Sequence, residues 1–202
     1  MADKKSQQLK SARHQTQLVR GGLYRSSHGE TSEAIFMNSG YVFENAEQAE
    51  SRFAGEEEGY LYTRYGNPTV TMFEERMALN EGTESCFATA SGMSAVFASL
   101  MCLLKTGDHV VSSRALFGGC YHVIDQILPR YGIITDLIDG TDIKQWEKTI
   151  SRKTKCIFFE TPSNPTMEII DIQHVSNIAH QHGALVIVDN IFASPVLQKP
   201  IN

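Results

Sequence analysis

From Pro68 onward, hydrophobic positions alternate between helical spacing and short continuous apolar runs. Apolar residues that recur every three to four positions indicate helices, and apolar runs of about five residues indicate buried strands. Helices are predicted at 69–80, 92–104, 119–130, 142–150 and 171–182. Strands are predicted between them at 84–88, 108–112, 132–137, 155–159 and 184–188. This alternation predicts an α/β fold with a mostly parallel sheet sandwiched by helices.

The first 60 residues lack this regularity. They contain Gly, Ser and acidic clusters, and the acidic run Glu56–Glu58 is most simply a solvated loop. We therefore expect an extended N-terminal arm over residues 1–60 and an α/β domain over residues 61–202. Apolar positions in the arm, such as Ile35 and Phe36, are predicted to gain a core by docking on another subunit.

Composition narrows the function classes. The chain has 202 residues, 42% hydrophobic and 20% charged, and this suffices for one domain core. A net charge of −5 gives no electrostatic reason to bind nucleic acid or an anionic membrane. No stretch has the length of a membrane span. Residues 4–20 carry five Lys or Arg and no acid, which favours a solvated arm over a transit peptide.

The four cysteines form no C-x-x-C pair, and they are interpreted as reduced residues of a protein in a reducing, cytoplasmic compartment. His180 and His182 are two positions apart on an expected helix end and do not share a face. No metal site is therefore predicted.

Asp189 ends the apolar run ALVIVDN (184–190). Ligands of open α/β sheets bind at the carboxyl ends of the strands, so this carboxylate is a candidate ligand contact. An unpaired charge there costs several kcal/mol. Since this segment offers no obvious Arg or Lys, we expect a cationic or protonated group on a ligand.

Two further junctions carry candidate ligand contacts. The run ATASGM (88–93) predicts a strand end, a tight turn and a helix start, whose backbone N–H groups favour an anion. Gly92 permits close approach of a phosphate, and Ser91 either binds it or acts as an ordinary helix cap. SRALFGG (113–119) adds an aromatic residue. Together with Asp189 these features suit a flat, phosphorylated heteroaromatic ring.

Five segments in this order resemble the cystathionine γ-synthase group of pyridoxal-phosphate (PLP) enzymes, also called the Cys/Met-metabolism family. They are YTRYGNPT (62–69), ATASGM (88–93), ALFGG (115–119), ETPSNPT (160–166) and VDN (188–190). The opening stretch 24–69 is similar to the O-succinylhomoserine sulfhydrylases of that group. Five motifs in a fixed order identify a family far more specifically than any single motif does.

The resemblance implies the large domain of a fold-type I, aminotransferase-like PLP enzyme, and it assigns roles to individual residues. Asp189 pairs with the pyridinium nitrogen, and the backbone amides of Gly92 and Met93 hold the phosphate. Phe117 takes the place of the ring-stacking aromatic, without the hydroxyl that many family members have there. Asn164 is either a contact of the phenolic oxygen or a turn residue before Pro165.

Tyr62 and Arg64 match the pair that the family delivers to the phosphate from a neighbouring subunit, so a homodimer or homotetramer with shared active sites is implied. The residue-level alternative for this pair is a plain surface patch. The Schiff-base lysine is expected about two dozen residues after Asp189, beyond Asn202. Lys199 is too early for that role and is not assigned.

The activity that the resemblance implies is γ-replacement in methionine biosynthesis, in which O-succinylhomoserine and sulfide give homocysteine and succinate. Cystathionine γ-synthase, cystathionine γ-lyase and methionine γ-lyase activities are alternatives within the family. A different class of function is a non-catalytic module, since without the lysine the chain can at most hold the cofactor non-covalently. Dinucleotide binding is disfavoured because neither G-x-G-x-x-G nor a P-loop is present.

Overall fold

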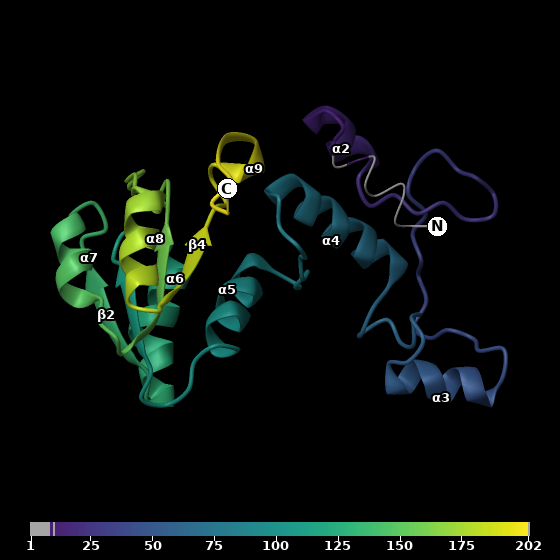
Figure 1. Cartoon of the computed structure of the whole chain (residues 1–202), viewed down its shortest axis with the longest axis horizontal. Helices are drawn as coiled ribbons and strands as arrows, with labels where there is room; N and C mark the ends of the chain where they lie inside the picture. Colours follow the sequence, from purple (N-terminus) through teal and green to yellow (C-terminus); the bar gives the residue numbers. More distant parts are fainter. Residues whose placement is uncertain (1–8, 10, 202) are drawn as a thin grey trace. The chain divides into compact units, whose positions relative to one another are not determined.

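The computed structural model describes residue 9 and residues 11–201. The chain divides into two compact units, Met1–Ala88 and Thr89–Asn202 (Figure 1). The assignment of an arm to residues 1–60 and a cofactor-binding domain to residues 61–202 stays a prediction.

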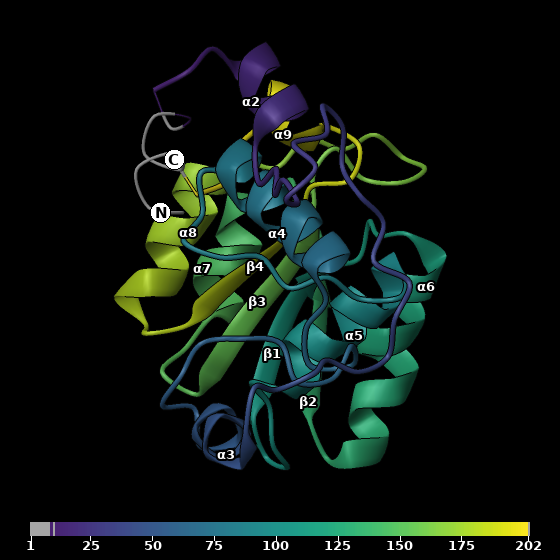
Figure 2. The same cartoon turned by 90° about the vertical axis from the view of Figure 1, so that its right-hand side faces the viewer.

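The second unit contains a four-stranded sheet in the order β2-β1-β3-β4, with every neighbouring pair parallel (Figure 2). The strands are β1 (His109–Ser113), β2 (Ile134–Ile138), β3 (Thr154–Glu160) and β4 (Leu185–Asp189). The four strand predictions in this region are thereby confirmed to within two residues. Because the strands are parallel, their carboxyl ends lie at one edge of the sheet, and Glu160 and Asp189 are partners in the register of β3 and β4.

Helices follow the strands as expected for a parallel sheet. They are α5 (Gly92–Met101), α6 (Gly118–His122), α7 (Ile143–Thr149), α8 (Ile172–Gln181) and α9 (Ser194–Leu197). The helix predicted at 119–130 begins as α6 but continues as a π-helical turn, Val123–Ile127, and a 3₁₀ turn, Leu128–Tyr131. Pro129 lies in that last turn, where its ring has no N–H to continue an α-helix.

The sheet separates two hydrophobic clusters. Successive strand residues point to opposite faces, so Val110 and Phe158 join one cluster while Val111 and Phe159 join the other. Leu100 of α5 packs in the first cluster, and Trp146 of α7 packs in the second. Helices therefore cover both faces, and the predicted α/β class is confirmed.

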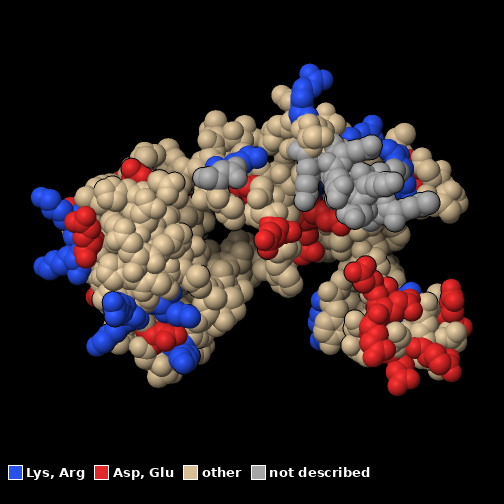
Figure 3. Space-filling model, in the orientation of Figure 1, with Lys and Arg blue, Asp and Glu red and all other residues tan. Residues whose placement is uncertain are grey.

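The first unit has a different organisation. It contains α2 (His14–Arg20), α3 (Ala46–Ala54) and α4 (Pro68–Glu81), and an isolated bridge pairs Gly40 with Tyr62. The short helices α2 and α3 fall in the stretch that was expected to be irregular. Acidic side chains gather over α3 and its flanking segments in Figure 3, among them Glu44, Glu47, Glu50, Glu56 and Glu58.

The strand predicted at 84–88 is wrong, because this segment forms no strand in the structure. A strand needs a neighbour to accept and donate its backbone hydrogen bonds, and the described sheet contains only β1 to β4. The Ala88 N–H instead donates to the Glu74 carboxylate at 2.7 Å, and Phe87 is 85% exposed. The segment 84–88 thus has the composition of a strand, but no neighbouring strand pairs with it in the described sheet.

No helix in the described part of the chain is long and apolar enough to cross a membrane.

Candidate functional site

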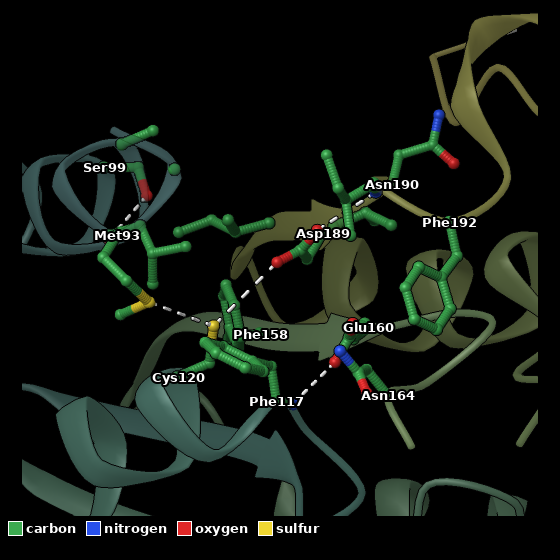
Figure 4. A pocket seen from close by; sticks show the side chains of 16 residues that line it. Met93, Ser99, Phe117, Cys120, Phe158, Glu160, Asn164, Asp189, Asn190 and Phe192 are labelled. Carbon is green, nitrogen blue, oxygen red and sulfur yellow. Dashed lines mark hydrogen bonds between the residues drawn. The ribbon is translucent and has the colours of Figure 1, made fainter. Parts of the chain in front are cut away.

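A pocket of about 530 Å³ lies at the carboxyl edge of the sheet in the second unit (Figure 4). It is lined by residues of the first turns of α5, the loop that leads into α6, and the ends of β3 and β4. Its walls include Val96, Phe158 and Ile187. The volume lies in the range of small-molecule sites.

The start of α5 contributes free backbone donors. The Ser91 hydroxyl oxygen accepts a hydrogen bond from the Ser94 N–H at 3.1 Å, so Ser91 acts as the helix cap. In the described residues no acceptor engages the N–H groups of Gly92 or Met93, which are the first two of the helix. The pocket therefore has an anion-binding corner.

Asp189 ends β4 and lines the pocket. Its Oδ1 accepts a hydrogen bond from the Ile191 N–H at 3.1 Å, and the Cys120 thiol lies 3.9 Å from its Oδ2. Burial and the charge of Asp189 raise the pKa of Cys120 to about 12, so this thiol stays neutral and is a weak donor. Oδ2 therefore remains able to accept a strong hydrogen bond from a ligand.

A second carboxylate lies beside the first. Glu160 ends β3, its exposure is 0%, and its Oε2 accepts a hydrogen bond from the Phe117 N–H at 2.7 Å. Burial raises the pKa of Glu160, and the charge of Asp189 adds to this shift, whereas the backbone amides of Phe117 and Asn164 oppose it. No Lys, Arg or His lines the described pocket, so the two carboxylates have no protein cation there.

Phe117 and Asn164 reach the pocket from two loops. Phe117 lies in the loop after β1 and is 45% exposed. The loop 160–166 is held by Ser163, whose hydroxyl accepts from the Glu168 N–H at 2.9 Å, and by Thr161, whose hydroxyl accepts from the Ile170 N–H at 3.0 Å. Because these two side chains tie down the loop, the Asn164 side chain is left to line the pocket near Glu160 (Figure 4).

Tyr62 and Arg64 belong to the first unit. The Arg64 guanidinium carbon lies 5.4 Å from the centre of the Tyr62 ring and 5.5 Å from that of Tyr65. Tyr62 is 44% exposed, and Arg64 is exposed as well. This cation–π arrangement keeps the two side chains together, with the charged group available to a partner.

Five of the eight residues selected from the sequence thus line one pocket, namely Gly92, Met93, Phe117, Asn164 and Asp189. Ser91 lies directly before them as the cap of α5. Sequence reasoning missed Cys120 and Glu160 as pocket residues. Glu160 carries the same signal as Asp189, a carboxylate at the end of an apolar run, CIFFE, whereas nothing in the sequence distinguishes Cys120 from a core cysteine.

The described residues contain no group of three or more His, Cys, Asp or Glu arranged to hold a metal ion. The pocket combines unengaged backbone N–H groups at the start of α5 with two carboxylates, Glu160 and Asp189.

Comparison with known proteins gives a family match. The model of a family described as Cys/Met metabolism PLP-dependent enzyme matches residues 15–202. An O-succinylhomoserine sulfhydrylase of Mycobacterium tuberculosis is 54% identical over 181 residues, which are 90% of this chain and 45% of the relative. One of Pseudomonas aeruginosa is 47% identical over 96% of this chain and 48% of the relative. An L-methionine gamma-lyase of Fusobacterium nucleatum is 38% identical, over 92% and 47% respectively.

Solved structures agree with these matches. An O-acetylhomoserine (thiol)-lyase of Campylobacter jejuni, solved with N'-pyridoxyl-lysine-5'-monophosphate, has a TM-score of 0.89 and 36% identity over 95% of this chain and 47% of that one. Cystathionine gamma-lyase of Lactobacillus plantarum has a TM-score of 0.84 and 34% identity over 94% and 48%. The chain spans about half the length of the relatives it matches.

Proposed function

Because the chain belongs to the Cys/Met-metabolism family of PLP-dependent enzymes, we propose that its pocket binds pyridoxal 5'-phosphate. We further propose that the complete protein converts O-succinylhomoserine and sulfide to homocysteine and succinate. The chain spans about half of its relatives, so the activity of the complete protein rests on this proposal.

The observation that carries the proposal is the unusual charge pattern of the pocket. Two carboxylates, Glu160 and Asp189, line one side without a protein cation, and the unengaged N–H groups of Gly92 and Met93 line another. A ligand that fits must therefore have a protonated group and an anion on one flat body. PLP has both, in its pyridinium nitrogen and its phosphate.

Each residue has a defined task toward this cofactor. Asp189 holds a proton at the ring nitrogen, while Gly92, Met93 and Ser91 bind the phosphate. Phe117 packs on the ring, and Asn164 donates to the phenolic oxygen. Tyr62 and Arg64 reach the phosphate from a second copy of the chain. We propose the arm over residues 1–60 for these subunit contacts, in a homodimer or homotetramer.

When bound, the cofactor supplies an electron sink for bonds at the α-carbon of an amino acid. The side chains of the pocket set how well it does so. A carboxylate beside the ring nitrogen favours the protonated ring, and the apolar walls exclude water from it. Phe117 has no hydroxyl, so it provides a packing surface and cannot transfer a proton.

The substrate proposal rests on the sulfhydrylase relatives and on the opening stretch 24–69. The test is a competition assay on the complete protein, in which sulfide and cysteine are offered with O-succinylhomoserine and the products are separated. We expect homocysteine to form faster than cystathionine. A strong preference for cysteine would favour cystathionine γ-synthase activity, and breakdown of cystathionine or methionine would favour the lyases.

A non-catalytic module that holds the cofactor without a covalent bond is the alternative from another class of function. Borohydride reduction in the presence of PLP separates the two. It should fix the cofactor covalently to a lysine of the catalytic protein. The 202-residue chain alone should release the cofactor on dialysis.

A further inference from the structure

Glu160 has a role that the residues discussed so far do not explain. It is the last residue of β3, its exposure is 0%, and its neighbour in the register of β4 is Asp189. A buried carboxylate next to a second carboxylate is costly. A carboxylate in this position therefore needs contacts that offset this cost, or a function that requires it.

The contacts of Glu160 show which part of the pocket it holds. Its Oε2 accepts the Phe117 N–H at 2.7 Å, a bond between positions 43 residues apart. The Phe117 N–H precedes the first turn of α6, and Glu160 is its acceptor among the described residues. The Asn164 amide also favours the Glu160 charge. Glu160, which begins the loop 160–166 that carries Asn164, thus connects that loop to the one that carries Phe117.

The ring of Phe117 lies close to the backbone of Gly119. A Cβ added at Gly119 would lie 3.0 Å from Cε1 of Phe117 and 2.8 Å from Sδ of Met93, closer than side chains normally approach. Gly119 therefore leaves the space that the Phe117 ring and the Met93 side chain occupy, and the backbone bond to Glu160 holds Phe117 in place. The residue as a whole is 45% exposed, so burial contributes little to holding it in place.

We propose that Glu160 is a positioning residue, which fixes Phe117 through its backbone N–H so that the ring presents its face to a bound heteroaromatic ligand. One oxygen, Oε1, is buried without a hydrogen bond in the described part of the chain. The inference rests on the proposed cofactor site for the identity of the ring.

The proposal depends on the reach of the side chain, so two variants separate reach from charge. Glu160→Gln keeps the length and an acceptor oxygen but loses the charge. Glu160→Asp keeps the charge but is one methylene shorter. Glu168→Gln is the control, because it removes a charge in the same loop region outside the pocket lining.

The first measurement needs no ligand. Hydrogen exchange at the Phe117 amide is followed in the full chain by fragmentation mass spectrometry. We expect about tenfold faster exchange in Glu160→Asp, because its shorter side chain does not reach the Phe117 N–H. Exchange in Glu160→Gln and Glu168→Gln should stay within about threefold of the parent chain, because both keep an acceptor oxygen at the position of Glu160 Oε2. Equal exchange in all four proteins would overturn the proposal, as would equally fast exchange in both Glu160 variants.

The second measurement titrates pyridoxal phosphate and, separately, inorganic phosphate. Glu160→Asp should weaken pyridoxal phosphate about tenfold and leave inorganic phosphate unchanged, because the ring contact is altered and the anion corner is not. If the parent chain fails to bind pyridoxal phosphate, the proposed cofactor site is wrong. The exchange result still tests whether Glu160 positions Phe117. If the parent binds and Glu160→Asp binds equally well, the positioning role is wrong.

Discussion

The two units of the chain reach order by different means. The second buries large side chains completely, with Trp146 and Phe159 at 0% exposure on one face of the sheet. In the first, the buried apolar side chains of the described part are Pro68, Met72 and Ala78, whereas Met37 and Val42 are more than 90% exposed.

Polar contacts hold much of the first unit instead. Arg52 pairs with Glu57, Tyr24 donates to Glu75, and Arg76 pairs with Glu33. Exposed ion pairs contribute little to stability, and exposed apolar clusters favour association. The second unit thus has its own hydrophobic core. The first unit exposes apolar side chains that a partner subunit could cover, as the proposed subunit contacts require.

The largest expected effect tests this contrast directly. Trp146→Ala should lower the free energy of unfolding by about 3–5 kcal/mol, because it removes a fully buried ring whose Nε1 donates to the Gly140 carbonyl at 2.9 Å. Val42→Ala, at a 93% exposed position, should change it by less than about 0.5 kcal/mol. Urea denaturation followed by circular dichroism measures both.

A large decrease in the free energy of unfolding for Val42→Ala would contradict this difference between the two units. It would mean that this part of the first unit is covered in solution. Urea denaturation at several protein concentrations then tests what covers Val42. If the loss of unfolding free energy in Val42→Ala grows with protein concentration, a second copy of the chain covers this residue.

The same contrast explains what the sequence could predict. β1, β3 and β4 have apolar runs because both faces of the sheet are covered, and such runs are detectable without a structure. The segment 84–88 has a similar run, but a strand also depends on a distant neighbour, which local sequence does not specify.

In the first unit the useful signals were caps and not periodicity. Asn45 accepts from the Gln48 N–H at 2.7 Å, Gln48 accepts from the Glu44 N–H, and Gly55 ends α3 in the left-handed conformation. A polar cap with Gln three residues later is a helix-start signature. α3 was missed because it is only nine residues long and none of its residues is buried, so few apolar positions mark it.

The pocket was predictable where chemistry follows from position in the fold. Asp189 at a strand end and Gly92 at a helix start both line it. Glu160 ends a strand in the same way and was still overlooked, because its partner, the Phe117 amide, is 43 residues away. Contacts between loops are set by the sheet register and not by local sequence.

A second prediction concerns chemistry in the second unit. Asp189→Asn in the complete protein should lower turnover on the order of 100-fold or more while PLP stays bound, because a neutral amide cannot hold the ring nitrogen protonated. Asp136→Asn, an exposed carboxylate on β2 outside the pocket, is the control. Near-normal turnover of Asp189→Asn would remove Asp189 from its proposed role.

The third prediction joins the two units through a partner subunit. Arg64→Ala should weaken PLP binding about tenfold, because it removes a charged donor from the phosphate. Arg52→Ala is the matched control, since Arg52 also faces an aromatic ring, that of Phe43, and has no proposed ligand. Fluorescence titration measures both affinities.

Mixing Arg64→Ala with Asp189→Asn sharpens this prediction. If each site uses both chains, a hybrid dimer has one site with both changes and one with neither, so activity should partly return. Proven subunit exchange without recovered activity would place Arg64 in the site of its own chain or away from the cofactor.

The smallest expected effect compares one cap in each unit. Ser91 caps α5, which buries Leu100 completely, whereas Asn45 caps α3, which buries nothing. Ser91→Ala should therefore lower the free energy of unfolding by about 1 kcal/mol. Asn45→Ala should let α3 fray without a global loss, because no core depends on that helix. An equal loss for Asn45→Ala would show that α3 packs on a partner in solution. PLP titration of Ser91→Ala then decides between the two readings of Ser91, because a cap alone leaves the affinity unchanged and a phosphate ligand does not.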